Sequence, residues 1–299
     1  MNDKIIIVVL QYNNSKLTLD CLESLSYCRD EFYSVAVVDN NSEAEHQLAA
    51  DYYCKNNNNW CFFIQNSKNG GYSNGNNIGI RYALGRGASH VLILNNDVVL
   101  ERGDITALRK QCNSLENIGL AGPAIGEHGT VFYGGIIRWL AAELHHNLEK
   151  PPSGILPTDI YLPGMALLIR REVFEKSGLL DERFFLYFED VEFCQRARES
   201  GFMLAIESAV VVTHRGSAST SAISHTTLLR YHYRNALLFN SLHAPRRVKM
   251  LLPFWAVKVY VKQLLKTIFI PRRGAAGAAI IEGIRDYYNK RWGMTENAL

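Results

Sequence analysis

The sequence predicts an α/β fold with a mainly parallel sheet flanked by helices, and three observations support this prediction. Short apolar runs rich in β-branched residues recur through the first hundred positions, segments with helical spacing separate them, and polar residues follow each run. Strands that alternate with helices at this spacing form βαβ units, whose right-handed crossovers make the strands parallel. A nucleotide-binding domain is therefore the expected class, because open α/β sheets bind ligands beyond the carboxyl ends of their strands.

The first half of the chain is predicted to alternate strictly between the two element types. Turn-forming residues close each apolar run, and the Asn-rich stretch ends the second helix. The predicted elements are strand 5–10, helix 17–25, strand 35–39, a helix from after Asn41 to the turn at 56–59, strand 60–65, helix 72–84 and strand 91–94.

The segment HVLILNNDVVL (90–100) carries the carboxylate that most directly suggests a site. Four apolar residues precede Asn95, Asn96 and Asp97, so a buried strand would deliver a single carboxylate to the ligand-facing edge of the sheet. A turn in which Asn and Asp bond their own backbone would explain the same residues without a ligand.

Polar residues at the other strand ends would line the same crevice. Asp39 has the chemistry to accept a hydrogen bond from the imide N–H of uracil or thymine, with an N-cap for the next helix as the alternative. Tyr12 could cover a base or ribose, and Gly71 would let the backbone approach a ligand, although the spacing is not GxGxxG. The candidates are Gln11, Tyr12 and Asn13, then Asp39 and Asn41, then Asn69, Gly71 and Asn76, and finally Asn96 and Asp97.

Composition limits the class of protein. The chain has 299 residues, of which 47% are hydrophobic and 20% charged, as expected for a globular protein with one large core and an appended segment. The formal net charge is +3, and the Lys and Arg residues crowd the C-terminal part, which argues against a uniformly basic nucleic-acid binder. Six cysteines without a CxxC pair suggest neither zinc nor a disulfide framework, and they fit reduced thiols in the cytosol. The apolar run 5–10 is too short for a signal peptide.

Three carboxylates, Glu189, Asp190 and Glu192, lie at the predicted start of a helix that runs towards Ser200. The helix macrodipole favours acids there, so an acidic first turn without chemistry is the alternative explanation. Upstream, GTVFYGG (129–135) is expected in a hairpin, and the polar stretch 145–159 in an exposed loop.

Six segments, taken in order, resemble the family 2 glycosyltransferases of the GT-A fold. The similarity is greatest to the rhamnosyltransferase-like branch that builds bacterial surface polysaccharides, and it covers roughly residues 4–240. The segments are QYNN (11–14), VVDNNS (37–42), NGGYSNGNNIGI (69–80), LNNDV (94–98), PGMALLIRREVF (163–174) and FFLYFEDVEFCQRARESGF (184–202).

The resemblance implies a metal at the donor diphosphate. In the family, the LNNDV position is a DxD-like motif, but here Asp97 is the only carboxylate because Asn95 stands where another could be. One carboxylate with two phosphate oxygens remains workable for Mg²⁺ or Mn²⁺. His214 matches a family histidine that can approach the metal or diphosphate, with a structural role as the alternative. Arg234 could reach a phosphate, or form a surface salt bridge.

The resemblance assigns the general base to Asp190. The aspartate of the family's ED pair deprotonates the acceptor hydroxyl as it attacks the anomeric carbon opposite the leaving nucleotide, which implies inversion. A tight turn at Pro163 and Gly164 is expected to place Gly164 and Met165 beside the donor sugar, where, with Glu189, they would contact the acceptor. A purely structural turn is the alternative.

The expected function is inverting transfer of a sugar to a glycan or lipid-linked acceptor in surface polysaccharide synthesis. L-Rhamnose from dTDP-rhamnose is the first candidate, and a UDP-hexose or UDP-galactofuranose transferase is the alternative. A nucleotide-sugar-binding protein without turnover is another class. A sugar-1-phosphate nucleotidyltransferase would show a glycine-rich loop after the first strand, whereas QYNNSK (11–16) has no glycine.

Residues 1–243 are expected to form the transferase domain and residues 244–299 a basic amphipathic helical segment. The stretch 246–273 is long and apolar, but lysines spaced by four residues interrupt it on one helical face. Such a helix lies in a membrane interface, and packing on the domain or in a homodimer is the alternative. The expected location is therefore cytoplasmic, peripheral on the inner face of the membrane, with no nucleic-acid partner. The lysines are Lys258, Lys262 and Lys266, and Val257, Tyr260, Val261, Leu264 and Ile268 fall largely on the opposite face.

Overall fold

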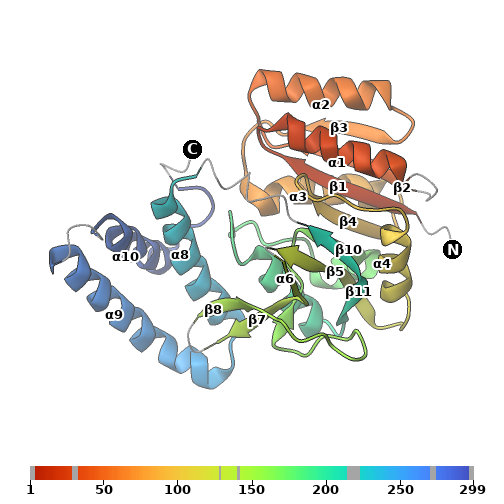
Figure 1. The fold of residues 1–299 in the computed structure, drawn as a ribbon. Helices are drawn as coiled ribbons and strands as arrows, with labels where there is room; N and C mark the ends of the chain where they lie inside the picture. The colour runs from red at the N-terminus through yellow and green to blue at the C-terminus, as the bar shows by residue number, and fades with distance from the viewer. Residues whose placement is uncertain are drawn as a thin grey trace.

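A central sheet of eight strands organises the chain (Figure 1). The computed structural model describes residues 4–28, 33–127, 129–139, 142–213, 223–269 and 274–295. Its strands are β1 (Ile5–Gln11), β2 (Tyr33–Asp39), β3 (Cys61–Gln65), β4 (His90–Asn95), β5 (Ile118–Glu127), β6 (Thr130–Phe132), β7 (Gly135–Arg138), β8 (Glu143–His146), β9 (Ile160–Tyr161), β10 (Ala166–Arg170) and β11 (Met203–Thr213). Its helices are α1 (Ser15–Tyr27), α2 (Ala44–Asn56), α3 (Gly71–Gly85), α4 (Asp104–Cys112), α5 (Arg171–Ser177), α6 (Glu189–Glu199), α8 (His225–His243), α9 (Arg246–Phe269) and α10 (Gly274–Tyr288).

The strand order is β3-β2-β1-β4-β10-β5-β11, and β6 pairs with β5 beside this path. Strands β1 to β4 are parallel, β11 is parallel to β5, and β10 runs antiparallel between β4 and β5. The predicted α/β fold with a mainly parallel sheet and flanking helices is confirmed. A second, smaller sheet has the order β8-β7-β9.

Both faces of the sheet are covered, which explains why its strands are continuous apolar runs. In β1, Ile5, Ile7 and Val9 pack against the side that holds α1, α2 and α4, whereas Ile6 and Val8 pack against α3. All five side chains are at most 3% exposed. Each contributes roughly 1.5–3 kcal/mol of burial free energy, so the core fixes the strand ends firmly.

The elements α4 and β5 were not foreseen from the sequence. Strand β5 contains Gly119, Gly122, Pro123 and Gly126, residue types that disfavour strands. It forms because β10 and β11 pair with its two edges. The expected hairpin is present as the antiparallel pair of β5 and β6.

The stretch 145–159, expected as an exposed loop, is largely exposed, and only its residues 154–156 bond to β11. The N–H of Leu156 donates to the carbonyl of Leu204 at 2.9 Å, and the N–H of Ile206 donates to the carbonyl of Gly154 at 2.7 Å. His145 and His146, at its beginning, belong to β8.

Three helices, α8, α9 and α10, form a layer beside the sheet domain (Figure 1). The single helix predicted for 246–273 corresponds to α9, and α10 is an additional helix. Leu237 of α8 packs with apolar side chains of α9 and α10, so the segment after residue 243 shares its core with α8. Among the helices that the structure describes, none is both long and apolar enough to cross a membrane.

Arg230 of α8 joins α10 through a largely buried ion pair. Its Nε lies 2.5 Å from Oδ2 of Asp286, whose side chain is 2% exposed, and its Nη1 lies 3.0 Å from Oε2 of the half-exposed Glu282. Gly283 lies so close to Arg230 that a Cβ would be 2.4 Å from the Arg230 carbonyl oxygen. The two helices are therefore in direct backbone contact.

Asp286→Ala is expected to lower the free energy of unfolding by about 2–3 kcal/mol, because it leaves Arg230 partly buried without its main partner. Urea denaturation measures the change. Glu282→Ala is the matched control on the same arginine, and its loss should stay below about 1 kcal/mol because Glu282 is solvent-exposed. Equal losses in the two variants would contradict this account.

Candidate active site

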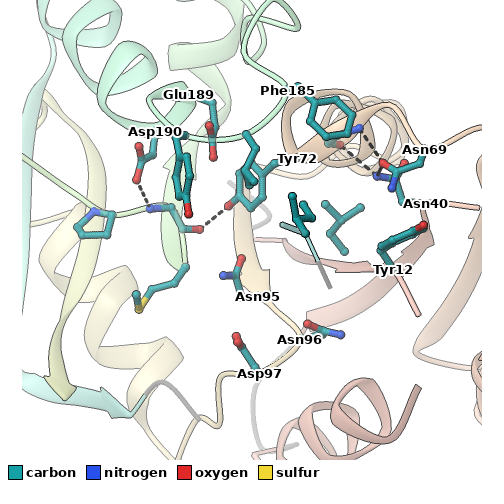
Figure 2. A pocket seen from close by; sticks show the side chains of 18 residues that line it. Tyr12, Asn40, Asn69, Tyr72, Asn95, Asn96, Asp97, Phe185, Glu189 and Asp190 are labelled. Carbon is teal, nitrogen blue, oxygen red and sulfur yellow. Dashed lines mark hydrogen bonds between the residues drawn. The ribbon is translucent and has the colours of Figure 1, made fainter. Parts of the chain in front are cut away.

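A pocket opens where β1, β2 and β4 end and the loop before α6 crosses over them (Figure 2). It encloses about 290 Å³, close to the lower end of the range for small-ligand sites. Figure 2 shows Asn95, Asn96 and Asp97 on one side, Glu189 and Asp190 on the opposite side, and Tyr72 between them. The lining residues are Leu10, Tyr12, Asn40, Asn69, Gly71, Tyr72, Asn95, Asn96, Asp97, Pro163, Gly164, Met165, Phe185, Leu186, Tyr187, Glu189, Asp190 and Ile223.

The antiparallel pairing of β4 with β10 brings two distant motifs together. Leu94 pairs with Ala166, and the N–H of Asn95 donates to the carbonyl of Met165 at 2.8 Å. The end of β4 therefore lies beside the start of β10. As a result, Asp97 and Gly164 face the same pocket although they lie 67 positions apart in the sequence.

Asp97 supplies a buried negative charge to the pocket wall. Its side chain is 4% exposed. Burial and, in second place, the charge of Asp97 raise the pKa of Cys21 to about 12. The neighbouring Asn96 donates from Nδ2 to Oγ1 of Thr18 at 3.0 Å, which ties this turn to α1.

Of the candidate site residues that follow β1 and β2, some line the pocket and others form hydrogen bonds in the structure that surrounds it. Tyr12 lines the pocket. Gln11 and Asp39 lie in a buried network, in which Gln11 Nε2 donates to Asp39 Oδ2 at 2.8 Å and the N–H of Ser42 donates to Asp39 Oδ1 at 2.9 Å. Asn13 Oδ1 accepts from the N–H of Glu43. These contacts connect the ends of the two strands.

Asn40, one of the polar residues that follow β2, lines the pocket and organises the wall near Asn69 and Gly71. Its Nδ2 donates to Asn69 Oδ1 at 2.9 Å and to the Gly71 carbonyl at 3.1 Å, and its Oδ1 accepts from Asn66. The adjacent Asn41 is exposed, with a φ of 66°. The available signal was the position of Asn40 directly after the strand, inside the motif VVDNNS.

Gly71 lets the start of α3 contact the loop before α6. Its φ is +81°, and a Cβ would lie 2.4 Å from the Phe185 carbonyl oxygen. The N–H of Tyr72 donates to that same carbonyl at 2.9 Å, and the Tyr72 hydroxyl donates to the carbonyl of Gly164 at 2.6 Å. Asn76, further along α3, is buried and donates to the Tyr72 carbonyl.

The loop 184–188 adds three lining residues that were not foreseen, Phe185, Leu186 and Tyr187. Tyr187 and Phe188 have φ values of 70° and 72°, a left-handed conformation that costs non-glycine residues roughly 1–2 kcal/mol each. Asn235 of α8 compensates by donating from Nδ2 to the carbonyls of Leu186 at 2.8 Å and Tyr187 at 2.9 Å. This turn aims the first residues of α6 into the pocket.

Glu189 and Asp190 differ in their hydrogen bonding. Asp190 Oδ2 accepts from the N–H of Gly164 at 3.0 Å, and its Oδ1 accepts from the N–H of Val191 at 2.8 Å. Burial raises the pKa of Asp190, and these two bonds oppose the rise. Burial first, and the charge of Asp190 second, raise the pKa of Glu189 well above its usual value. Glu189 is therefore protonated more readily than Asp190, and Asp190 is the one of the two that more readily stays ionised.

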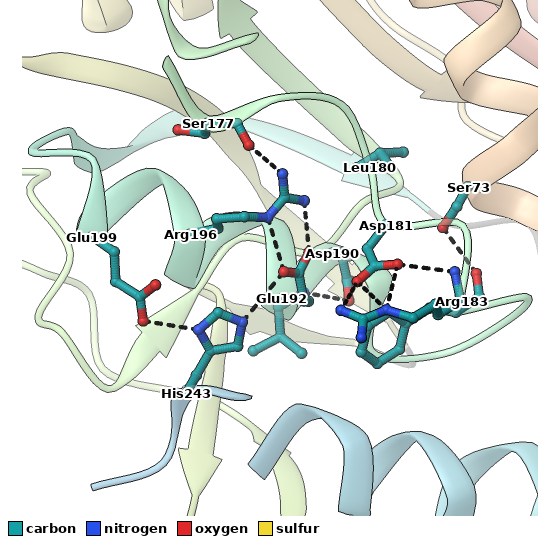
Figure 3. Close-up of polar contacts among 12 residues, drawn as sticks. Ser73, Ser177, Leu180, Asp181, Arg183, Asp190, Glu192, Arg196, Glu199 and His243 are labelled. Carbon is teal, nitrogen blue, oxygen red and sulfur yellow. Dashed lines mark hydrogen bonds and ion pairs between the residues drawn. The ribbon is translucent and has the colours of Figure 1, made fainter. Parts of the chain in front are cut away.

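A second set of contacts holds α6 against the end of α8 (Figure 3). Glu192 accepts from Arg196 Nη2 at 2.7 Å and lies 3.2 Å from Nε2 of His243, whose Nδ1 lies 2.8 Å from Glu199. Burial alone would lower the pKa of His243, but the bonds to Glu192 and Glu199 outweigh it and raise that pKa. His243 therefore braces the helix that carries Asp190, and its raised pKa favours the protonated form of the ring.

Arg234 lies outside the pocket wall, in contrast to its expected phosphate contact. Its side chain is fully buried, and its Nη1 donates to the carbonyls of Gly293 at 2.8 Å and Arg291 at 3.3 Å. Burial lowers its pKa to about 10. The guanidinium fastens the C-terminal segment to α8 because those carbonyls take its hydrogen bonds. His214, the other expected ligand, lies outside the described residues.

The donor atoms beside Asp97 suit a hard cation. The carboxylate of Asp97 and the amide side chains of Asn95 and Asn96 offer oxygen ligands on one side of the pocket. Over the ranges that the structure describes, no group of three or more His, Cys, Asp or Glu residues could hold a metal ion. A cation at Asp97 would therefore need further oxygens from a bound diphosphate and from water.

Known proteins resemble this chain in sequence and in fold. Residues 6–178 match the model of Glycosyl transferase family 2. The chain is 28% identical over 257 residues to the low-salt glycan biosynthesis hexosyltransferase Agl10 of Haloferax volcanii, which covers 80% of this chain and 76% of the relative. It is 26% identical over 255 residues to the dTDP-rhamnosyl transferase RfbF of Shigella flexneri, over 82% and 83% of the two chains.

The mannosyltransferase PcManGT of Pyrobaculum calidifontis, solved in complex with GDP-Man and Mn²⁺, has a similar fold. The TM-score is 0.57 at 13% identity, and the match covers 96% of this chain and 87% of that one.

The brace at His243 predicts a pH-dependent contribution to stability. The pKa of His243 is higher in the folded state than in the unfolded state, where it is about 6.5. The stabilisation that protonated His243 provides is therefore fully present below the unfolded pKa, and it is lost as the pH rises through the folded pKa. His243→Gln should lower the free energy of unfolding by about 1–2 kcal/mol near pH 6 and by less at alkaline pH.

Urea denaturation of wild type and variant across this pH range measures the difference. His145→Gln is the matched control, because His145 pairs with Glu143 at 3.2 Å while both side chains are more than half exposed. Its effect should stay below about 0.5 kcal/mol. A pH-independent loss in His243→Gln would refute the protonated brace.

Proposed function

The chain belongs to glycosyltransferase family 2, and we propose that within this family it is an inverting transferase that moves a sugar from a nucleotide diphosphate to an acceptor hydroxyl. The observation that carries this proposal is the opposition of Asp190 and Asp97 across one pocket. Single displacement needs a base on the attacking side and charge stabilisation on the leaving side. The two carboxylates offer one group for each side.

Asp190 is the proposed general base. The acceptor hydroxyl would give its proton to Asp190 while its oxygen forms a bond to the anomeric carbon and the bond to the diphosphate oxygen breaks. The raised pKa suits this role, since a base works best with a pKa closer to the operating pH. The N–H groups of Gly164 and Val191 fix the direction of the carboxylate.

Glu189 is proposed to contact the acceptor as a neutral acid. It is 7% exposed and lines the pocket, and its raised pKa favours the protonated form. A protonated carboxyl group can donate a hydrogen bond to a sugar hydroxyl. Met165 and Gly164 would form the adjoining surface, with the Gly164 carbonyl held by Tyr72.

The donor is proposed to lie along the strand ends from Asn40 to Asp97. Tyr12 would cover the base or ribose, Asn69 and Gly71 would adjoin the ribose and diphosphate, and Asn96 would fix the turn that presents Asp97. Gln11, Asn13, Asp39 and Asn76 support these groups through the contacts already described.

Mg²⁺ or Mn²⁺ at Asp97 would, when bound, offset the charge of the departing diphosphate. The Mn²⁺ in the complex of the structurally similar mannosyltransferase supports this choice. His214 remains a proposed additional ligand.

dTDP-rhamnose is the first donor to test, because a relative matching over 83% of its length is a dTDP-rhamnosyl transferase. A UDP-hexose or UDP-galactofuranose is the alternative, and the hexosyltransferase relative keeps it open. The proposed acceptor is a glycan or lipid-linked glycan of a surface polysaccharide, used on the cytoplasmic side of the cell membrane. A binding protein without turnover would not need a carboxylate such as Asp190, whose direction two backbone N–H groups fix.

Asp190→Asn should reduce turnover by about 10²–10⁴-fold, because the amide cannot accept the hydroxyl proton. Donor affinity, measured by calorimetry against dTDP- and UDP-sugars, should remain near that of the wild type. Glu175→Gln, an exposed carboxylate of α5, is the control and should keep full turnover. Turnover of Asp190→Asn close to the wild-type rate would exclude Asp190 as the base.

Asp97→Ala should weaken donor binding and activity by at least roughly tenfold, because it removes the proposed anchor of the cation. Chelation with EDTA should reproduce this loss in the unmutated protein, and added Mn²⁺ should restore activity there. Glu45→Ala, an exposed carboxylate of α2, is the control. Full wild-type activity in excess EDTA would show that the site works without metal.

A further inference from the structure

Helix α9 has two apolar faces, and the protein covers one of them. Leu252 and Ala256 are buried against Leu237 of α8 and Ile280 and Ile284 of α10. This contact attaches α9 to the rest of the molecule. Packing on the rest of the molecule, the alternative to membrane binding for this segment, thus accounts for one face of the helix.

The other face presents a continuous row of exposed apolar side chains. The spacing of three or four residues places them on one side of the helix, along about 27 Å. This size and continuity distinguish the row from isolated surface hydrophobic residues, which need no partner. We name as the α9 stripe the side chains Met250, Phe254, Val257, Val261, Leu264 and Ile268, which are 69%, 73%, 62%, 47%, 41% and 60% exposed.

Only positive charges accompany the α9 stripe. The sequence from Arg246 to Phe269 contains two arginines and four lysines and no acidic residue. Lys258, Lys262 and Lys266 follow the stripe along one side, because their four-residue spacing keeps them together on the helix. Two copies of α9 packed stripe to stripe would bring like charges together, so charge disfavours self-association and favours an anionic partner.

The shape of α9 selects among anionic partners. The helix lies at the edge of the molecule (Figure 1). Its Leu252 and Ala256 face α8 and α10, so helical periodicity places the stripe on the side away from those two helices. A protein partner would need a groove complementary to this convex surface, whereas a fluid bilayer adapts to it. Amphipathic helices with a cationic border bind in the plane of such an interface.

We propose that α9 docks the protein on an anionic phospholipid bilayer, with the α9 stripe at the boundary of the acyl chains and the lysines among the headgroups. This inference extends beyond the proposed reaction. Helix α8 connects α9 to the pocket. Its Leu237 packs against α9, and its Tyr231 stacks on the pocket residue Phe185 with the ring centroids 5.2 Å apart. Docking would therefore hold the pocket in a fixed direction relative to the membrane.

Vesicle sedimentation of the full-length protein tests the proposal. The wild type should sediment with vesicles of phosphatidylglycerol and phosphatidylcholine (one to three) and at least roughly tenfold less with phosphatidylcholine alone. Phe254→Glu/Val261→Glu should reduce binding to the anionic vesicles by roughly tenfold or more. Leu48→Glu/Tyr52→Glu is the matched control, because these side chains on α2 are 66% and 71% exposed, and it should bind like the wild type.

Lys258→Glu/Lys262→Glu/Lys266→Glu should also lose binding, and high salt should weaken the binding of the wild type. The proposal is wrong if the wild type does not bind anionic vesicles or if the stripe variant binds as well as the wild type. It is also wrong if sedimentation velocity shows a dimer that Phe254→Glu/Val261→Glu converts to a monomer without any change in vesicle binding. The assay contains neither donor nor acceptor, so its result is independent of the proposed transfer reaction.

Discussion

The antiparallel insertion of β10 between β4 and β5 is the constraint on which the pocket depends. The bond from the N–H of Asn95 to the carbonyl of Met165 fixes the end of one strand to the start of the other. Gly164, one residue earlier, then donates its N–H to Asp190 and accepts from Tyr72. A shift of this register by one residue would turn each β10 side chain to the opposite face and separate the two carboxylate sites.

Helix α6, which carries Glu189 and Asp190, is held by favourable contacts that offset the strain and the buried charge at its start. The left-handed turn at Tyr187 and Phe188 is strained, and two acids are buried at the beginning of α6. Asn235 satisfies the turn, the positive end of the helix dipole favours the acids, and His243 braces the next turn through Glu192. The pKa values of Glu189 and Asp190 differ in consequence because only Asp190 receives backbone hydrogen bonds from a neighbouring strand end.

Helix α8 links the pocket to the C-terminal helices. Asn235 and Tyr231 contact the loop that lines the pocket, while Arg230 and Leu237 contact α10 and α9. The segment after residue 243 is thus packed into the layer that supports the pocket. Substitutions on the exposed surface of α9 are for this reason a cleaner probe of its role than removal of the whole segment, which would also uncover α8.

The sequence by itself determined the α/β class, the first seven elements and the start of α6. Strands that are buried on both faces appear as continuous apolar runs, and helix ends carry characteristic residues, so both can be recognised locally in the sequence. It also predicted a set of site residues, of which Tyr12, Asn69, Asp97, Gly164 and Asp190 line one pocket in the structure. Tertiary structure alone decided that β5 is a strand despite its glycines, that Phe185 lines the pocket and that Arg234 binds backbone carbonyls. Those outcomes depend on partners distant in sequence, which no local pattern records.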